Sequence, residues 1–147
     1  MCIRDSHTLA VNSHENDFAC ITDISKMLSD ECYRVISNTD YDCRDLKSLY
    51  SYCDYIVGTR FHSVIFSLAS GVPALAISYV GNKSVGIMSD MGLSDYVLHI
   101  DSVSAEELRA KFATLVRNEE EVKAKLSAYM DNIPAERKTL IGLIEGA

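Results

Sequence analysis

One stretch, from Cys53 to Tyr79, constrains the fold more than any other part of this sequence. Asp54–Val57 is a short run of β-branched and aromatic residues, which is typical of a buried strand. A helical segment starting at Arg60 follows it, and Ala74–Ser78 is a second apolar run. Two apolar strands joined by a helix predict a right-handed βαβ unit with parallel strands. The sequence therefore predicts an α/β protein.

The helix between these strands carries its own start and stop signals. Gly58 ends the first strand, and the hydroxyl of Thr59 can cap a helix that begins at Arg60. Gly71 stands in the usual position after a helix, and Pro73 follows two residues later. Four residues of the helix recur at helical spacing and share one face: His62, Ile65, Phe66 and Ala69.

The remaining chain continues the alternation of strands and helices. Further strands are predicted at Thr8–Asn12, Tyr33–Ser37 and Tyr96–Ile100, with helical stripes between them. Asp42 can cap the short helix after the second of these strands, and Gly92 ends the helix that follows Ala74–Ser78. A capping signal at Ser104 opens a helical C-terminal tail, whose last segment starts at Pro134. This order predicts a parallel sheet with helices on both faces and a helical tail that packs back over it.

The composition excludes several classes of function. The net charge of −7 argues against nucleic acid and anionic lipid as main partners. Hydrophobic residues make up 48% of the chain, which indicates a globular protein, and no apolar run approaches the roughly 20 residues of a membrane span. The five cysteines form no C-x-x-C pair, so we expect reduced thiols in a cytoplasmic protein and no metal site.

The first six residues, MCIRDS, look foreign to this fold. They have neither periodicity nor a capping pattern, and they also read as the translation of a transposon-end adapter used in sequencing libraries. We therefore exclude residues 1–6 from the fold as an adapter-derived scar and expect residues 7–147 to form a single domain. On this interpretation the natural start of the chain is lost.

Polar side chains follow three of the predicted strands at their carboxyl ends. His14 follows the first strand, Arg60 and His62 follow the third, and Tyr79 and Lys83 follow the fourth. If the strands are parallel, these ends face one crevice, where helix N-termini favour anions. Ordinary structural roles remain open: a core histidine for His62, a surface ion pair for Arg60, and solvated side chains for Lys83 and His14. The residues alone indicate an anion- or nucleotide-binding domain and no particular reaction.

The run GTRFHSVIFSLASGVPALAISY, followed by Lys83-x-x-Gly86 and Met91-Gly92-Leu93, resembles the polysaccharide pyruvyl transferases. The likeness extends from about Leu9 to about Asn118. It is most specific where R-x-H, G-x-P and the Tyr/Lys pair occur together.

This resemblance implies a place in a larger enzyme. The family's fold is similar to that of GT-B glycosyltransferases, with two Rossmann-like domains, and this chain would be most of the C-terminal one. The N-terminal domain and the first strand of the C-terminal domain would then be missing. Because that strand is central in the order 3-2-1-4-5-6, we expect either an unfilled slot between Thr8–Asn12 and Asp54–Val57 or direct pairing of those two strands.

The resemblance also implies a reaction, the transfer of a pyruvyl group from phosphoenolpyruvate to two sugar hydroxyls, giving a ketal. His62 matches the motif histidine and would act as general acid, while Arg60 would bind carboxylate or phosphate. Thr59 and Tyr79 would contact substrate, and Lys83 and His14 would add anion contacts. The partners would be the donor, a glycan or lipid-linked acceptor, and the missing N-terminal domain. The donor would need no further cofactor, and the acceptor would bring the enzyme to the membrane periphery.

Two other functions remain open at this point. A nucleotide-sugar glycosyltransferase or epimerase of the same fold would use the helix N-terminus for a pyrophosphate. Such enzymes usually carry acidic contacts to ribose after the strand that follows the G-x-P motif. The loop Tyr79–Lys83, which follows that strand here, supplies none. A different class of function is a non-catalytic remnant or a partner-binding domain, without turnover of its own.

Overall fold

The computed structural model describes residues 3–6, 17–29, 33–37, 41–79 and 83–145. The described chain forms two compact units, which divide between Cys53 and Asp54.

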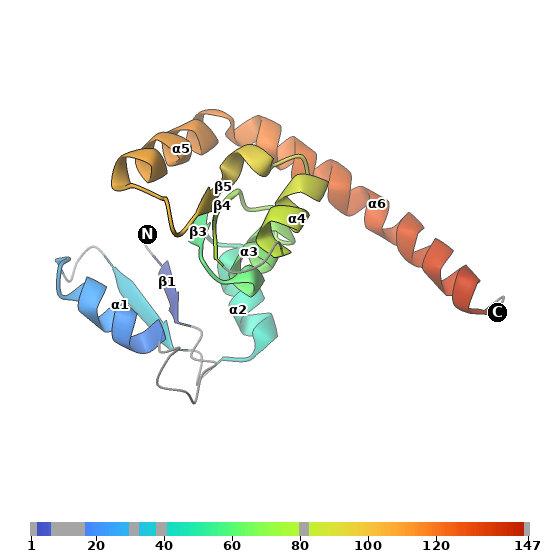
Figure 1. Ribbon diagram of the computed structural model, residues 1–147. Coiled ribbons are helices and arrows are strands. Elements are labelled where there is room, and N and C mark those ends of the chain that lie inside the picture. The colour runs from blue at the N-terminus through green and yellow to red at the C-terminus, as the bar shows by residue number, and fades with distance from the viewer. Residues whose placement is uncertain (1–2, 7–16, 30–32, 38–40, 80–82, 146–147) are drawn as a thin grey trace. The chain divides into compact units, whose positions relative to one another are not determined.

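The first unit contains a two-stranded parallel sheet with two helices (Figure 1). Strand β1 (Ile3–Ser6) pairs with β2 (Arg34–Ser37) from Ile3↔Arg34 to Ser6↔Ser37. The exclusion of residues 1–6 from the fold is thus corrected for Ile3–Ser6. The physical reason is that strand formation depends on the pairing partner more than on local periodicity, and β2 offers the β-branched Val35 and Ile36. The adapter origin of these residues stays a prediction.

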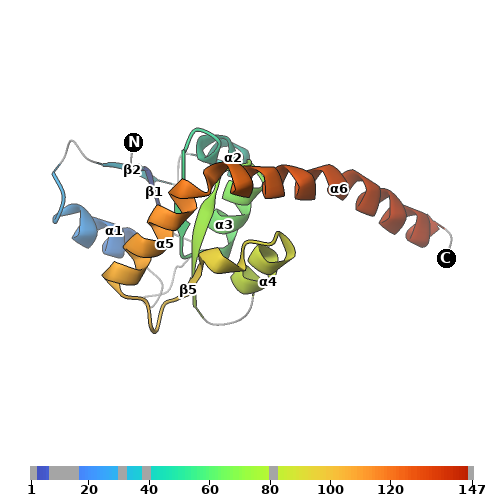
Figure 2. The same ribbon diagram turned by 90° about the horizontal axis from the view of Figure 1, so that it is seen from above.

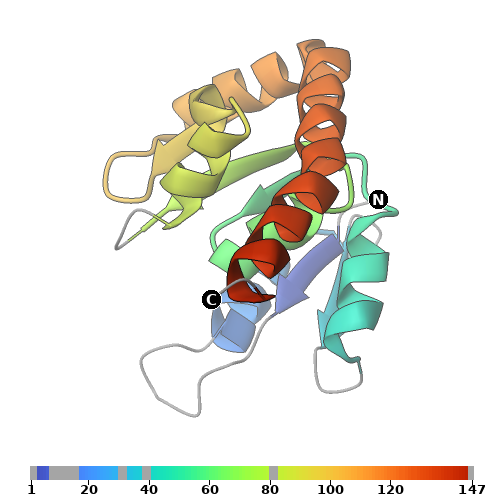
Figure 3. The ribbon, with the colours of Figure 1, turned by 90° about the vertical axis from the view of Figure 1, so that its right-hand side faces the viewer.

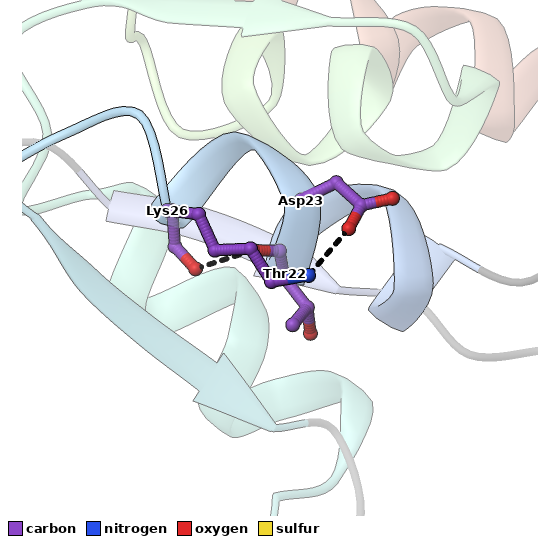
Figure 4. Close-up of polar contacts among 4 residues, drawn as sticks. Thr22, Asp23 and Lys26 are labelled. Carbon is purple, nitrogen blue, oxygen red and sulfur yellow. Dashed lines mark hydrogen bonds and ion pairs between the residues drawn. The ribbon is translucent and has the colours of Figure 1, made fainter.

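The helices of this unit are fixed by local polar contacts. In α1 (Asp17–Ser25), the Ser25 hydroxyl donates to the Thr22 carbonyl over 2.8 Å. Just beyond the helix, Lys26 pairs with Asp23 over 2.8 Å (Figure 4). Helix α2 (Cys43–Tyr50) begins with a complete capping box, in which Asp42 accepts from the Arg44 and Asp45 N–H groups and Asp45 accepts from the Asp42 N–H. The predicted cap at Asp42 follows from the ability of a short carboxylate to satisfy free helix N–H groups.

The second unit is built on a three-stranded parallel sheet in the order β3-β4-β5. Its strands are β3 (Ile56–Gly58), β4 (Ala74–Ser78) and β5 (Val97–His99), which lie side by side in Figure 3. Its helices are α3 (Phe61–Leu68), α4 (Lys83–Asp90), the 3₁₀ turn η1 (Ser94–Tyr96), α5 (Ala105–Arg117) and α6 (Glu119–Glu145). The predicted βαβ unit is confirmed, and Ala74–Ser78 has the predicted bounds.

Helices cover both faces of this sheet. Helices α3 and α4 lie on one side and α5 on the other (Figure 2). The side chains between them form one core, which reaches into the first part of α6. Its fully buried large members are Val64, Leu68, Leu75, Met88, Leu93, Leu115, Val122 and Leu126. This core fixes the strand ends relative to the helices that follow them.

The turns after α3 and α4 need glycine. Gly71 has a φ of 72° and Gly92 a φ of 67°, and this left-handed region is costly for any residue with a Cβ. Both glycines therefore stop their helices, as the sequence predicted. Ser104 caps α5 by accepting the Glu107 N–H over 3.0 Å, which confirms the other capping signal.

Helix α6 differs from the prediction at Pro134. We expected Pro134 to start a separate segment, but it lies inside one continuous helix. Proline removes a single backbone hydrogen bond, and the good helix formers Ala135–Lys138 carry the helix on after it. From Asp131 to Gly142 every side chain is exposed, and this part of α6 extends beyond the rest of the unit (Figures 1 and 2). Within the described residues, no helix has the length and apolarity that crossing a membrane requires.

The described strands form two separate parallel sheets, and their pairing does not join β1 or β2 to β3. The strand expected at Thr8–Asn12 lies outside the described residues. The central slot predicted next to β3 therefore stays a prediction.

Candidate functional site

The candidate site lies where β3 and β4 end. Because the strands are parallel, their carboxyl ends meet at one edge of the sheet, about 5 Å apart from strand to strand. Thr59 and Arg60 follow β3 directly, and Tyr79 follows β4. This edge is where open α/β sheets bind their ligands.

Gly58 brings the end of β3 unusually close to the start of α3. A Cβ at this position would lie 2.9 Å from Cγ2 of Val64 and 3.1 Å from the Ser63 hydroxyl oxygen. Val64 is fully buried, so its methyl group has no room to retreat. Glycine is therefore needed here to seat the helix N-terminus directly against the strand end.

The N-terminus of α3 carries no side-chain cap. Arg60 occupies the N-cap position with extended backbone angles, φ −83° and ψ 135°, and its side chain accepts nothing from the first turn. The Arg60 carbonyl instead receives the Val64 N–H over 3.2 Å and the Ser63 hydroxyl over 2.7 Å. The prediction that Thr59 caps this helix is wrong. The helix starts one residue later than expected, and its N-cap position falls to Arg60, which has no hydrogen-bond acceptor in its side chain.

His62 lies on the exposed side of the first turn of α3. Its ring contacts Phe61 edge to face, with ring centroids 5.8 Å apart and an interplanar angle of 62°. The alternative of a core histidine is therefore wrong. The buried face of α3 is formed by smaller or aliphatic side chains: Ser63, Val64, Ser67 and Leu68. Arg60 is half-buried beside it.

Tyr79 and Lys83 lie at the next strand and helix. Tyr79 is 43% exposed. Lys83 is exposed and forms the first residue of α4, whereas the sequence placed it in a loop. Neither side chain makes a hydrogen bond or ion pair to another described residue. The structure thus brings Thr59, Arg60 and His62 to one helix start and places Tyr79 and Lys83 around the neighbouring one, while His14 lies outside the described residues.

Sequence reasoning missed one residue at this edge, His99. We expected the last strand to run to Ile100, which made His99 an internal residue. The strand ends at His99, which pairs with Ser78 at the end of β4. The signal was available, since a histidine followed by Ile100-Asp101-Ser102 stands at the transition from an apolar run to a polar turn.

Among the residues that the structure describes, the largest pKa shift lies away from this edge. Tyr55 precedes β3, donates a hydrogen bond to Glu119 and stacks edge to face on Phe112. The hydrogen bond to Glu119, together with burial and the nearby carboxylates, raises the pKa of Tyr55 to about 12. Lys123 and Tyr55 together lower the pKa of Glu119. Because this cluster joins the amino end of β3 to α6, we assign it to the packing of the unit.

Two comparisons with known proteins found matches. The sequence profile described as "Polysaccharide pyruvyl transferase" matches residues 4–82, which include Thr59, Arg60, His62 and Tyr79. The amylovoran biosynthesis protein AmsJ of Erwinia amylovora is 33% identical over 99 residues. That alignment covers 67% of this chain and 23% of AmsJ, so the chain spans about a quarter of the length of this relative. No solved structure matches the chain.

Proposed function

Because this chain belongs to the polysaccharide pyruvyl transferase family, we propose that it supplies the donor-binding part of an enzyme that makes pyruvyl ketals. The donor is phosphoenolpyruvate, and the acceptor is a sugar of a growing exopolysaccharide or of its lipid-linked precursor. The reaction takes place in the cytoplasm, and the acceptor brings the enzyme to the membrane periphery. The rest of a longer enzyme contributes an N-terminal domain of the same GT-B-like architecture.

One observation carries this proposal: Arg60 and His62 occupy the uncapped N-terminus of α3 at the end of β3. The first-turn N–H groups and the helix dipole favour an anion at this point. A guanidinium adds two parallel donors that match a carboxylate or a phosphate. Phosphoenolpyruvate offers both groups on three carbons, which suits a site of this size and charge.

The chemistry divides between the two side chains. A proton must reach the methylene carbon of the enol, and the exposed imidazole of His62 is the proton donor. The second need is to neutralise the leaving phosphate, which Arg60 meets together with Lys83. Thr59 and Tyr79 add neutral hydrogen bonds around the donor, and His14 adds a further anion contact.

The helix N-terminus and the general acid have opposite electrostatic requirements. The positive end of a helix disfavours a protonated imidazole, yet the acid must carry its proton. A bound dianion about 4 Å away offsets the dipole. His62 can therefore act as the acid only beside a bound donor. NMR of the His62 ring with and without phosphoenolpyruvate tests whether the donor binds next to this side chain, and ring signals that do not move rule it out.

Turnover is tested on the full-length protein by phosphate release from phosphoenolpyruvate and by mass spectrometry of the acceptor. We expect His62→Asn to lower kcat by about 100-fold or more, within the range for loss of a general acid. Arg60→Gln weakens the binding of phosphoenolpyruvate. Ser89→Ala, an exposed change near the far end of α4, serves as the control. Wild-type rates in both site variants would contradict the proposal.

The glycosyltransferase or epimerase alternative is separated from this proposal by the donor. A nucleotide-sugar enzyme needs an acceptor for the ribose hydroxyls, and the sequence from Tyr79 to Lys83 contains no carboxylate. A thermal-shift comparison of phosphoenolpyruvate with a nucleotide sugar distinguishes the two, since the true donor stabilises the folded protein. For the 147-residue chain by itself we expect donor binding without turnover.

A further inference from the structure

His99 shares the functional edge and face of the sheet with the donor site. It pairs with Ser78, and Ala76 pairs with Gly58 on the other side of β4. Paired residues point to the same face, and residues two apart in a strand do so as well. His99 therefore belongs to the face on which Gly58 touches α3.

This face is also the one next to α4. Helix α4 packs on β4, β5 and α3, and it begins at Lys83. His99 ends β5, so it stands beside the β4–α4 junction and two strands away from the β3–α3 junction that carries Arg60 and His62. Two strand spacings separate the lines of β3 and β5, which is about 10 Å.

The backbone around His99 is held firmly, while its imidazole is left open. The Ile100 N–H donates to the Ser78 carbonyl over 2.9 Å. The His99 carbonyl accepts the N–H groups of Ser102 and Val103 over 3.1 and 2.9 Å. The side chain is exposed and forms no hydrogen bond or ion pair with any residue that the structure describes. The ring is therefore open to a ligand at this edge of the sheet.

Together with the proposed function, on which this inference rests, these observations point to the acceptor. A three-carbon donor seated at the start of α3 does not extend over two strand spacings, whereas a sugar next to it does. We infer that His99 contacts the acceptor sugar and takes the proton from the hydroxyl that attacks the donor. His99 lies outside residues 4–82, which the family profile matches.

After His62 has protonated the methylene carbon, the oxygen of the acceptor hydroxyl uses an electron pair to bond to the central carbon of the pyruvyl group. Its O–H bond breaks, and the proton passes to the free nitrogen of the His99 ring, which later returns it to water. The bond from the central carbon to the phosphate oxygen then breaks, and both electrons leave with phosphate. The second hydroxyl closes the ketal and releases its proton to solvent.

The test uses the full-length protein with His99→Ala, and with Ser94→Ala, an exposed change in the 3₁₀ turn that leads into β5, as the control. We expect kcat to fall by about 100-fold or more, the KM for phosphoenolpyruvate to stay within about twofold, and added imidazole to restore part of the rate. If His99→Ala does not fold, as judged by circular dichroism, His99→Gln is measured in its place, because it keeps a polar side chain but cannot take a proton.

Three results would overturn the inference. The first is a rate within about threefold of wild type in the His99 variant. The second is a loss that appears only in the KM for phosphoenolpyruvate, which would make His99 a donor contact. The third is a wild-type protein that releases no phosphate with any acceptor, and only this result also removes the proposed function.

Discussion

Gly58→Ala is the most direct test of how the site is built. The added Cβ would lie 2.9 Å from Cγ2 of Val64 and 3.1 Å from the Ser63 hydroxyl, and Val64 is fully buried. Forcing one methyl group into such packing costs about 1–3 kcal/mol. The strain falls on the joint between β3 and α3, so it also moves the first turn of α3 away from the strand end.

A matched control lies in α4. A Cβ at Gly86 meets no atom within 4 Å, and Gly86 sits inside a helix, where alanine is favoured over glycine by roughly 0.5–1 kcal/mol. The free energies of unfolding of the two Gly→Ala variants should therefore differ by about 2 kcal/mol or more, with one variant less stable and the other more stable than wild type. At a slope of about 2 kcal/mol per molar urea, this separates their unfolding midpoints by about 1 M.

The measurement is urea unfolding followed by circular dichroism, together with phosphate binding to the folded variants by calorimetry. We expect Gly58→Ala to lower both the midpoint and the phosphate affinity, and Gly86→Ala to raise the midpoint and leave the affinity unchanged. If Gly58→Ala unfolds at or above the wild-type midpoint, the close approach of β3 and α3 is not what fixes the site.

Two further predictions concern the rest of the second unit. Leu126→Ala removes a fully buried side chain from α6 and should lower the free energy of unfolding by about 2–5 kcal/mol. Leu140 is 59% exposed in the same helix, so Leu140→Ala should change that free energy by less than about 0.5 kcal/mol. Equal urea midpoints for the two variants would mean that α6 does not pack as described. Because the hydrogen bond to Glu119 raises the pKa of Tyr55 from 10.0 to about 12, the folded protein keeps a proton that the unfolded chain has lost. The stability from this bond is full below pH 10 and is lost as the pH rises toward 12, so Tyr55→Phe should flatten the pH dependence of thermal unfolding in that window, and an unchanged slope would contradict the assignment.

The sequence predicted the elements whose signals are local. Gly71 and Gly92 end their helices because only glycine adopts their left-handed backbone at low cost, and such a requirement is visible in one residue. The caps at Asp42 and Ser104 likewise depend on a side chain and an N–H group two or three residues away. The strand at Ala74–Ser78 stood out because it is buried on both faces and therefore apolar throughout.

The features that the sequence missed depend on distant partners. Ile3–Ser6 forms a strand only through its pairing with β2, and no local pattern shows that partner. Pro134 stays helical because the neighbouring residues outweigh a single lost hydrogen bond. His99 lies at the edge of the site because β5 pairs with β4 in a register that ends the strand at His99 and not at Ile100. The site residues at the strand-to-helix junctions were thus predictable from the sequence, whereas the addition of His99 depended on the pairing register.

Helices α2, α3 and α5 do not begin alike. Asp42 caps α2 and Ser104 caps α5, whereas Arg60 offers no acceptor to the first turn of α3. A missing cap costs about 1 kcal/mol of helix stability. An anion bound there would take the place of the absent side chain, because its oxygens accept the same N–H groups. Of these three helices, the one without a side-chain cap follows the predicted site strand, so an anion bound there would add to the stability of the fold.

Inorganic phosphate should therefore stabilise the protein specifically. At a concentration 100 times its dissociation constant, a ligand that binds only the folded state adds about 2.7 kcal/mol to the free energy of unfolding. Phosphate also stabilises proteins by exclusion from their surface, so the comparison is made with Arg60→Gln, which experiences the same exclusion but lacks the guanidinium. We expect the gain from phosphate to be clearly larger in wild type than in the variant. Equal gains in the two proteins would mean that no anion occupies the start of α3, and the donor site would then have to lie elsewhere.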